Sequence, residues 1–162
     1  MGKLKLTKKE EEKLEKLIST LELKGIRIKK AIYESYLSLE EITPPMIAEL
    51  EEEAKYENKK NVDEHIKRNY ILLVNYRFHF AARDQSEQKI FEIDAIYEAK
   101  YASDIKLTDK IFEIFKNVEV KFHLWPYFRE FLVDATVRMG FPPPRLPLFR
   151  VKYGITPKNN QN

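Results

Sequence analysis

Residues able to do acid–base or metal chemistry are present in this sequence, but they are not grouped as in a catalytic centre. The three histidines, His65, His79 and His123, are far apart, and none lies in an H-x-x-x-H or H-E-x-x-H motif. Carboxylates are abundant, but the runs at 10–12 and 51–53 lack the apolar flanks that would bury a catalytic acid. We therefore expect no catalytic residue and no metal site.

Motifs for nucleophiles and cofactors are missing as well. The chain has no cysteine, which excludes disulfides, thiolate metal sites and cysteine nucleophiles. Its 4 glycines form neither a Gly-rich phosphate loop nor a G-x-S-x-G elbow. We expect no cofactor and no enzymatic activity, so the sequence favours a binding protein.

One charged pair lies inside the most apolar stretch of the chain. Arg129 and Glu130 are adjacent in a predicted helix, so their side chains point to different faces. A role in catalysis would need further polar groups nearby. We expect instead that each residue pairs with a partner across an interface and fixes how subunits dock.

That predicted helix covers residues 126–139 and has two apolar stripes. Pro126 is typical of a first helical turn, and Gly140 followed by proline predicts the end of the helix. Val133 and Val137 form a narrow second stripe, which needs a partner of its own and therefore suggests self-association. The main stripe consists of Tyr127, Phe128, Phe131, Leu132, Ala135 and Met139.

The elements before this helix predict an α+β fold. A hairpin is predicted from the strict alternation of apolar and polar residues in 70–82 and 89–101. Another strand is predicted at 25–39, with apolar residues on both of its faces. Residues 40–68 could contain a helix by propensity or an edge strand by context. Helices are predicted at 5–20, capped by Thr7, and at 108–115.

Composition places limits on the environment and the partners. The chain has 162 residues and a net charge of +3 from 29 basic and 26 acidic residues, a mixed coat that does not indicate nucleic-acid binding. No apolar run approaches the ~20 residues of a membrane span, and the N-terminal residues do not resemble a signal peptide. We expect a cytoplasmic protein with no membrane insertion. Aromatic residues make up 12% of a chain that is 34% charged, so some aromatic stripes are expected to be exposed for binding.

The stretch LWPYFREFLVDATVRMGFPPPRLPL resembles the most characteristic segment of the SecB family of protein-export chaperones. The resemblance lies in Trp125-Pro126-Tyr127, the Arg129-Glu130 pair, and the Gly-Phe-Pro-Pro exit. It implies a four-stranded antiparallel sheet with a long C-terminal helix packed on it, and a short, charged second strand within 40–68, which we favour over a helix there. The helix predicted at 5–20 is an extra N-terminal helix added to this fold. The resemblance also implies a homotetramer, arranged as a dimer of dimers, that binds unfolded polypeptides without ATP and passes them to the motor SecA. The corresponding organisation is an N-terminal extension at 1–24, a SecB-like domain at 25–150 and a polar, flexible tail at 151–162.

Two departures from the export chaperones bear on the partner. Export SecB proteins are acidic and dock on SecA through a specific C-terminal tail, whereas this chain is basic and ends in GITPKNNQN. Together with the added N-terminal helix, these features are similar to SecB-like chaperones of toxin–antitoxin systems. Clients are therefore preproteins or an antitoxin, and binding to SecA is doubtful. The alternative is an oligomeric small-ligand or peptide-binding module without chaperone activity.

We expect the client groove to have a floor of sheet aromatics and a wall formed by the arm at 141–149. The expected client-binding residues are Tyr33, Tyr36, Leu37, Phe78, Phe80, Phe91, Phe141, Leu146, Leu148 and Phe149. The expected oligomer interface consists of Trp125, Tyr127, Arg129, Glu130, Val133 and Val137.

Overall fold

The structure of this chain is a computed structural model that describes residues 7–146. The expectations for Leu148, Phe149 and the tail at 151–162 lie outside the described residues.

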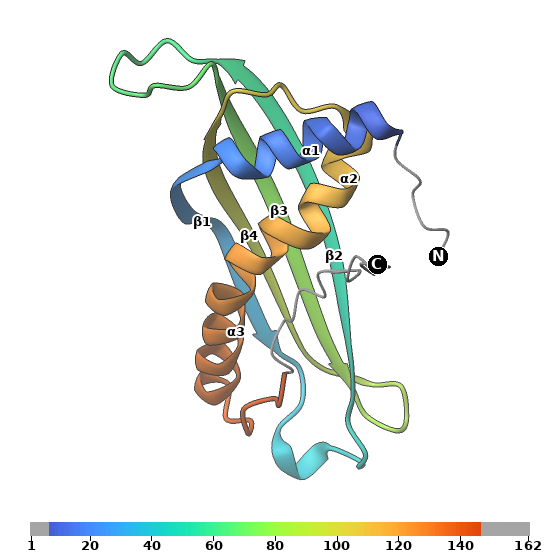
Figure 1. The fold of residues 1–162 in the computed structure, drawn as a ribbon. Helices are drawn as coiled ribbons and strands as arrows, with labels where there is room; N and C mark the ends of the chain where they lie inside the picture. The colour runs from blue at the N-terminus through green and yellow to red at the C-terminus, as the bar shows by residue number, and fades with distance from the viewer. Residues whose placement is uncertain (1–6, 147–162) are drawn as a thin grey trace, which may run out of the picture.

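The described chain is built on one antiparallel sheet of four strands in the order β1-β4-β3-β2. The strands are β1 (Glu22–Ser35), β2 (Ile47–Lys60), β3 (Tyr70–Arg83) and β4 (Lys89–Ser103), and a short 3₁₀ turn, η1 (Leu39–Glu41), lies between β1 and β2. The hairpin β3–β4 forms the centre of the sheet. The charged strand β2 lies at one edge, as expected, but it has 14 residues and is not the short strand that was expected in 40–68. The chain crosses from β1 at one edge to β2 at the other (Figure 1).

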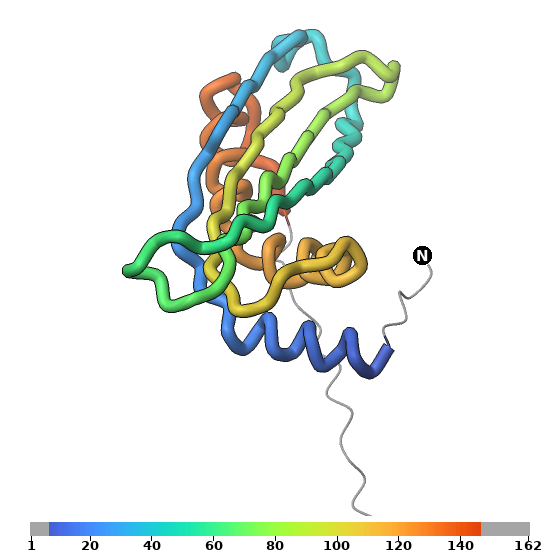
Figure 2. The backbone as a smooth tube through the Cα atoms, turned by 90° about the horizontal axis from the view of Figure 1, so that it is seen from above, coloured from blue at the N-terminus to red at the C-terminus, as the bar shows by residue number. Residues whose placement is uncertain are grey.

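The helices all lie on one face of this sheet (Figure 1). They are α1 (Lys8–Thr20), α2 (Asp109–Phe115) and α3 (Lys121–Arg138), with a π-helical turn η2 (Lys116–Val120) between the last two. Viewed from above, α1 runs beside α2 at one end of the sheet (Figure 2), and α3 lies beside β1 (Figure 1). The predicted α+β class, with an N-terminal helix and a long C-terminal helix, is confirmed.

The start of the long helix differs from the sequence-based expectation. α3 begins at Lys121, and Pro126 lies inside it rather than in its first turn. The helices predicted at 108–115 and 126–139 are also not separated, because the chain continues from α2 through the π-helical turn into α3. The Pro126 ring is exposed, so the helix carbonyl that loses its N–H partner faces water. The end of the helix agrees with the prediction: Gly140 has φ +86, and its N–H donates to the Val137 carbonyl at 3.0 Å.

The N-terminal helix is attached to the fold by apolar side chains, Leu14 and Leu17 among them, and by an ion pair to α2. Leu17 is fully buried. Glu10 accepts hydrogen bonds from the Thr7 backbone N–H at 2.7 Å and from Lys110 Nζ of α2 at 2.7 Å. The same carboxylate therefore caps α1 and joins it to α2.

The hydrophobic core lies between the helices and the inner face of the sheet. Residues of β3 and β4 that share this face are buried in strict alternation, as period-2 patterning requires. Phe78 at its centre stacks on Phe128 of α3, with ring centroids 4.3 Å apart and an interplanar angle of 10°. Trp125 and Tyr97 pack around the same ring at 6.1 and 6.0 Å. This aromatic cluster fixes α3 over the middle strands.

We predict that Phe78→Ala lowers the free energy of unfolding by about 3–5 kcal/mol, because it leaves a cavity in this aromatic cluster. Urea unfolding at fixed protein concentration measures the loss. Phe122→Ala is the matched control: Phe122 is 51% exposed, and its truncation should cost less than about 1 kcal/mol. Equal losses in the two variants would contradict this assignment of the core.

A second prediction concerns pH. The hydrogen bond from Lys110, followed by those from Thr7, lowers the Glu10 pKa from 4.5 to about 2. Because the folded-state pKa lies below the unfolded value, the stabilisation is fully present above pH 4.5 and is lost as the pH falls from 4.5 toward 2.

The unfolding midpoint of Glu10→Gln should therefore lie below that of the wild-type protein at pH 6, and the gap should narrow below pH 4.5. Glu12→Gln removes the same charge from the exposed side of α1 and is the control. A gap that stays constant from pH 6 to pH 3 would contradict the role of the Glu10 carboxylate.

Candidate binding groove between β1 and α3

A register shift in β1 decides which of its side chains share a face. Ile28 lies opposite Tyr97 of β4, Lys30 lies opposite Ile96, and the shift between Ile28 and Lys30 inserts one extra residue. After this irregularity Tyr33 lies opposite Ile93, which is buried like Tyr97. Ile28 and Tyr33 therefore lie on the same, inner face although their sequence parity differs. The shift explains the imperfect apolar alternation of this strand.

The inner face of β1 is left largely uncovered. β1 is an edge strand, and its apolar residues Ile28 and Tyr33 are 49% and 41% exposed. On the side facing β1, α3 presents Tyr127, which is 51% exposed, and Phe131, whose ring meets that of Tyr33 edge-on at 6.4 Å. The strand and the helix are thus two walls with a gap between them.

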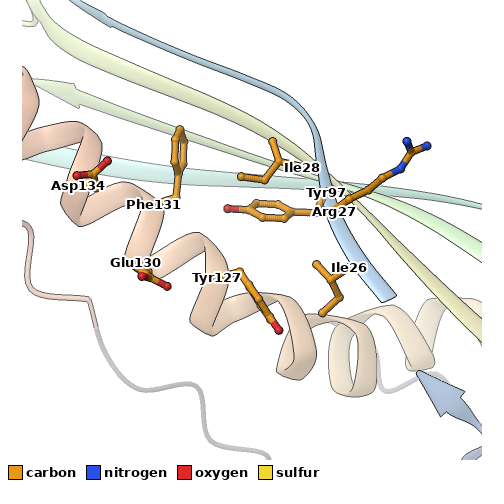
Figure 3. Close-up of a pocket in the computed structure, with 8 residues that line it drawn as sticks. All are labelled: Ile26, Arg27, Ile28, Tyr97, Tyr127, Glu130, Phe131 and Asp134. Carbon is orange, nitrogen blue, oxygen red and sulfur yellow. The ribbon is translucent and has the colours of Figure 1, made fainter. Parts of the chain in front are cut away.

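Two adjoining hollows fill this gap and share Ile26 and Tyr127; together we call them the β1–α3 groove. The first has a cavity volume of about 390 Å³ and is lined by Ile26, Arg27, Ile28, Tyr97, Tyr127, Glu130, Phe131 and Asp134 (Figure 3). The second has a volume of about 350 Å³ and is lined by Leu23, Ile26, Phe122, His123, Trp125, Pro126, Tyr127 and Arg129.

The floor of the first hollow contains a buried tyrosine hydroxyl. Tyr97 is 1% exposed, and its Oη has no hydrogen-bond partner in the described part of the chain. Figure 3 shows its ring crossing the hollow with the hydroxyl pointing toward α3, while Arg27 points away. Burial, and secondarily the nearby Glu130 carboxylate, raises the pKa of Tyr97, so the hydroxyl keeps its proton at neutral pH.

The second hollow is more apolar. Its imidazole, His123, lies with Nδ1 3.1 Å from Oη of Tyr101. Burial lowers the His123 pKa, and burial also raises the Tyr101 pKa. Both groups are therefore neutral near pH 7, and Arg129 is the charged residue of this otherwise largely apolar lining.

Three residues of the first strand and its exit were expected to contact clients. Tyr33 lies at the groove, on the inner face of β1. Tyr36 is 46% exposed, and its hydroxyl lies 2.6 Å from Glu92 and 2.7 Å from Glu34. Leu37 is half-buried against the core. Tyr33 meets Phe131 at the border of the β1–α3 groove, and none of these three residues lines either hollow.

The expectation of an open aromatic floor near the hairpin is corrected by burial. The exposed fractions are 0% for Phe78 and 4% each for Phe80, Phe91 and Phe141. Phe91 packs on Phe80 and on Phe141, with ring centroids 6.1 and 5.0 Å away, so the start of the arm closes over the hairpin. Leu146 is half-buried against the same core. In this conformation these side chains are core residues, because the helical layer and the arm cover β3 and β4.

The residues expected at an oligomer interface fall into two groups. Trp125 is 7% exposed and belongs mainly to the core, while Tyr127, Arg129 and Glu130 line the groove. Val133 is half-buried and Val137 is 54% exposed, so this stripe is only partly covered in the described chain. Self-association through these residues stays a prediction.

Sequence reasoning did not assign several groove residues. Ile26 and Ile28 were recognised as apolar members of the first strand, but their exposure depends on the strand's position at the edge of the sheet. Tyr97 was assigned to the apolar face of its strand, and nothing in the alternation distinguishes an unpartnered hydroxyl from a satisfied one. The other lining residues that were not predicted are Leu23, Arg27, Phe122, His123, Pro126, Phe131 and Asp134.

Residues 7–146 also lack two features that would point to other functions, a metal-binding cluster and a membrane-spanning helix. No group of three or more histidine, aspartate or glutamate side chains converges in a way that could hold a metal ion. No helix in this range combines the length and the apolar character needed to cross a membrane.

Comparison with known proteins gives a likeness of fold. No family model and no curated protein sequence matches the chain. Among solved structures, it is similar to the Mycobacterium tuberculosis SecB-like chaperone Rv1957, determined in complex with a ChAD peptide from the Rv1956 HigA1 antitoxin. The match has a TM-score of 0.69 at 18% sequence identity, and it covers 88% of this chain and 99% of that chain. The chain therefore has the SecB-like fold.

Proposed function

We propose that this protein is a chaperone that binds extended or unfolded polypeptides in the β1–α3 groove, without ATP and without enzymatic activity. The observation that carries the proposal is the apolar inner face of an edge strand, open to solvent beside an apolar helix wall. Exposed apolar surface of this kind is unfavourable in water and marks an interaction site. The proposal places the protein in the cytoplasm, where newly made polypeptides are met.

The geometry suits an extended chain better than a compact ligand. The groove is formed along a strand, and the outer edge of β1 has no strand partner in the described residues. A client can therefore combine side-chain contacts in the hollows with main-chain hydrogen bonds to the strand edge. Main-chain bonds are independent of sequence, which is what a chaperone with varied clients requires.

The complex of the mycobacterial chaperone with an antitoxin peptide supports an antitoxin as one client of this chain. We extend the proposal to an antitoxin that is held until it folds. Delivery of preproteins to SecA is the less supported possibility, because the chain has a net charge of +3 and lacks the acidic character of export chaperones.

We also propose that the protein works as a homo-oligomer, a tetramer built as a dimer of dimers. On α3, Val137 is exposed and Val133, one turn before it, is half-buried, so the described chain covers this stripe only in part. An isologous contact between two such helices would bury the stripe on both subunits at once.

The first functional prediction is that the protein suppresses aggregation of a chemically denatured client in the absence of nucleotide. Ile28→Ser and Tyr127→Ser should each weaken this suppression several-fold, because they place a hydroxyl in the apolar walls of the groove. Both side chains are about half exposed, so the free energy of unfolding should change by less than about 1.5 kcal/mol.

Val62→Ser is the matched control, because Val62 is 91% exposed in the β2–β3 loop, outside the groove. Light scattering of the aggregating client gives the readout at two salt concentrations. Full suppression by both groove variants would exclude the groove as the client site. If the wild-type protein does not suppress aggregation, the alternative of a small-ligand or peptide-binding module is favoured. If suppression falls steeply as the salt concentration rises, client binding is electrostatic, as it is in nucleic-acid-binding proteins.

The second functional prediction concerns assembly. Multi-angle light scattering at micromolar concentration should give the mass of a tetramer, and Val137→Asp should shift the mass to smaller species because it buries a charge in the helix contact. Val62→Asp, which introduces the same charge in the exposed loop, should leave the mass unchanged. A monomeric wild-type protein would contradict the proposed assembly.

A further inference from the structure

In the described chain, the sheet carries helices on only one of its faces. All three helices lie on the inner face (Figure 1), so the outer face of the four strands is open to solvent over residues 7–146. Along β3 and β4, the side chains between the buried ones point to this outer face. Such a solvated face is expected to be polar, and most of its side chains here are charged.

Three large apolar side chains depart from this expectation. Ile71 and Leu73 of β3 and Ile96 of β4 point to the outer face, and each is only half-buried. Together they form the outer-face stripe, which runs along β3 and crosses to β4 over about 15 Å, given the spacing of residues and strands. Apolar side chains aligned on a charged face suggest a contact with a partner.

Two hollows follow the outer-face stripe, and lysines line both of them. One has a volume of about 390 Å³ and is lined by Ile71 and Leu73, with Ile66 of the β2–β3 loop beside them. The other has a volume of about 560 Å³ and is lined by Ile96. The lysines that line these hollows are Lys29, Lys30, Lys55, Lys59, Lys60 and Lys100. We call the stripe and these lysines the outer-face trough.

The outer-face trough has a positive charge that the protein does not neutralise. Lysines outnumber carboxylates in its lining. Two of the carboxylates are already paired: Glu98 accepts from Arg27 Nε at 2.8 Å, and Glu57 lies 3.2 Å from Lys59 Nζ. The carboxylate of Asp63 accepts from the His65 backbone N–H at 2.9 Å. The lysines that make no ion pair within residues 7–146 are Lys30, Lys60 and Lys100.

The spacing of the lysines matches the width of an α-helix. Lys59 of β2 lies opposite Ile71, and Lys100 of β4 lies opposite Leu73, so lysines flank the stripe from both neighbouring strands. The strands β2 and β4 are two strand spacings apart, about 10 Å. A helix with its side chains is about 10–12 Å wide, and three of its turns extend about 16 Å. A helix laid along β3 would therefore cover the stripe and have lysines on both sides.

The chemistry of a sheet face favours a helix over an extended segment. The main-chain groups of β3 and β4 are used within the sheet, so a partner on this face meets only side chains. An extended peptide would bring its own N–H and C=O groups to the face without strand partners for them. A helix satisfies these groups internally, and lysine stems can pack on its flanks while their ammonium groups reach its carboxylates.

We propose that the outer-face trough docks an amphipathic helix of a partner protein, one whose apolar stripe is flanked on both sides by aspartate or glutamate. The apolar residues of the helix rest on Ile71, Leu73 and Ile96, and its carboxylates pair with the lysines. The docked helix gives the sheet a helical layer on each face. This site lies on the opposite face of the sheet from the β1–α3 groove, so it is a second function beyond the binding of clients.

The test uses fluorescein-labelled peptides of ~18 residues, about five helical turns, that share one helical pattern. The acidic peptide has leucines on one face, glutamates on both flanks, and alanine and glutamine on the far face. A basic counterpart carries lysines in place of the glutamates, and a polar counterpart carries glutamines in place of the leucines. Fluorescence anisotropy with the full-length protein should show the acidic peptide binding at least tenfold more tightly than either counterpart, with an affinity that falls as salt is added.

Two variants locate the site. The double variant Lys59→Glu/Lys100→Glu reverses one charge on each side of the stripe, so it should weaken binding of the acidic peptide at least tenfold and favour the basic peptide. Leu73→Ser should weaken the acidic peptide several-fold. Both variants should suppress client aggregation as well as the wild-type protein does, because these residues lie outside the β1–α3 groove.

Two controls accompany these variants. Lys8→Glu/Lys9→Glu makes the same change of net charge at exposed positions of α1, and it should leave the affinity within about twofold. Ile28→Ser, in the β1–α3 groove, should likewise leave binding of the acidic peptide unchanged.

Three outcomes would overturn the inference. The first is equal affinity for the acidic and basic peptides, or unchanged binding in Lys59→Glu/Lys100→Glu. The second is loss of binding in Ile28→Ser, which would place the peptide in the client groove. The third is a smaller mass of Lys59→Glu/Lys100→Glu in light scattering, which would show that a second copy of the chain covers this face. The chaperone proposal is tested separately, by the suppression of client aggregation.

Discussion

The packing of α3 on the two middle strands is the constraint on which the rest of the structure depends. A helix with its side chains is about 10–12 Å wide, whereas four strands spaced about 4.8 Å apart place their outer axes about 14 Å apart. A single helix therefore cannot cover the whole sheet. The stacked pair Phe78–Phe128 holds α3 over the centre. On the β2 side the gap is closed by α2, where Phe112 packs on Tyr56 at 4.3 Å. On the β1 side nothing in the described chain closes it.

The open side at β1 is consistent with a binding role and with a stable fold. The core is supplied by β3, β4 and the helices, so the apolar residues of β1 are not needed to hold the sheet together. Exposed apolar surface lowers the solubility of a protein. The high content of charged residues, 34% of this chain, offsets that effect. The long β2 edge carries a row of glutamates and lysines, which oppose unwanted edge pairing there. The β1 edge lacks such a dense charge row, so the two edges of one sheet have different capacities for pairing.

The β1–α3 groove contains two polar groups that would be unfavourable in a fully apolar core. An unpartnered Tyr97 hydroxyl is destabilising in a core, and an uncommitted Glu130 beside it would be unfavourable if it were fully buried. Both are tolerable at the border between core and solvent. Costs of this kind commonly mark functional sites.

Much of the fold was determined by local patterns in the sequence. Strict alternation in 70–82 and 89–101 predicted the central hairpin and its buried face, and Gly140 predicted the end of α3. The resemblance of the segment around Trp125 and Pro126 to SecB agreed with the four-stranded sheet, and the pattern of residues 5–20 predicted the added N-terminal helix. Patterns that depend on neighbouring residues along the chain were sufficient for these features, because alternation and capping are local.

The site depended on tertiary structure. Alternation shows which side chains share a face, but it does not show which strand is at the edge or how far a helix reaches across the sheet. Phe78 and Ile28 are both apolar strand residues, yet one is the centre of the core and the other is half exposed, because α3 lies over one and not over the other. The register shift between Ile28 and Lys30 likewise exists only in the pairing of β1 with β4. The sequence by itself thus determined the elements and their apolar faces, while the tertiary structure decided which of those faces stayed open, since burial is a property of neighbours that are distant along the chain.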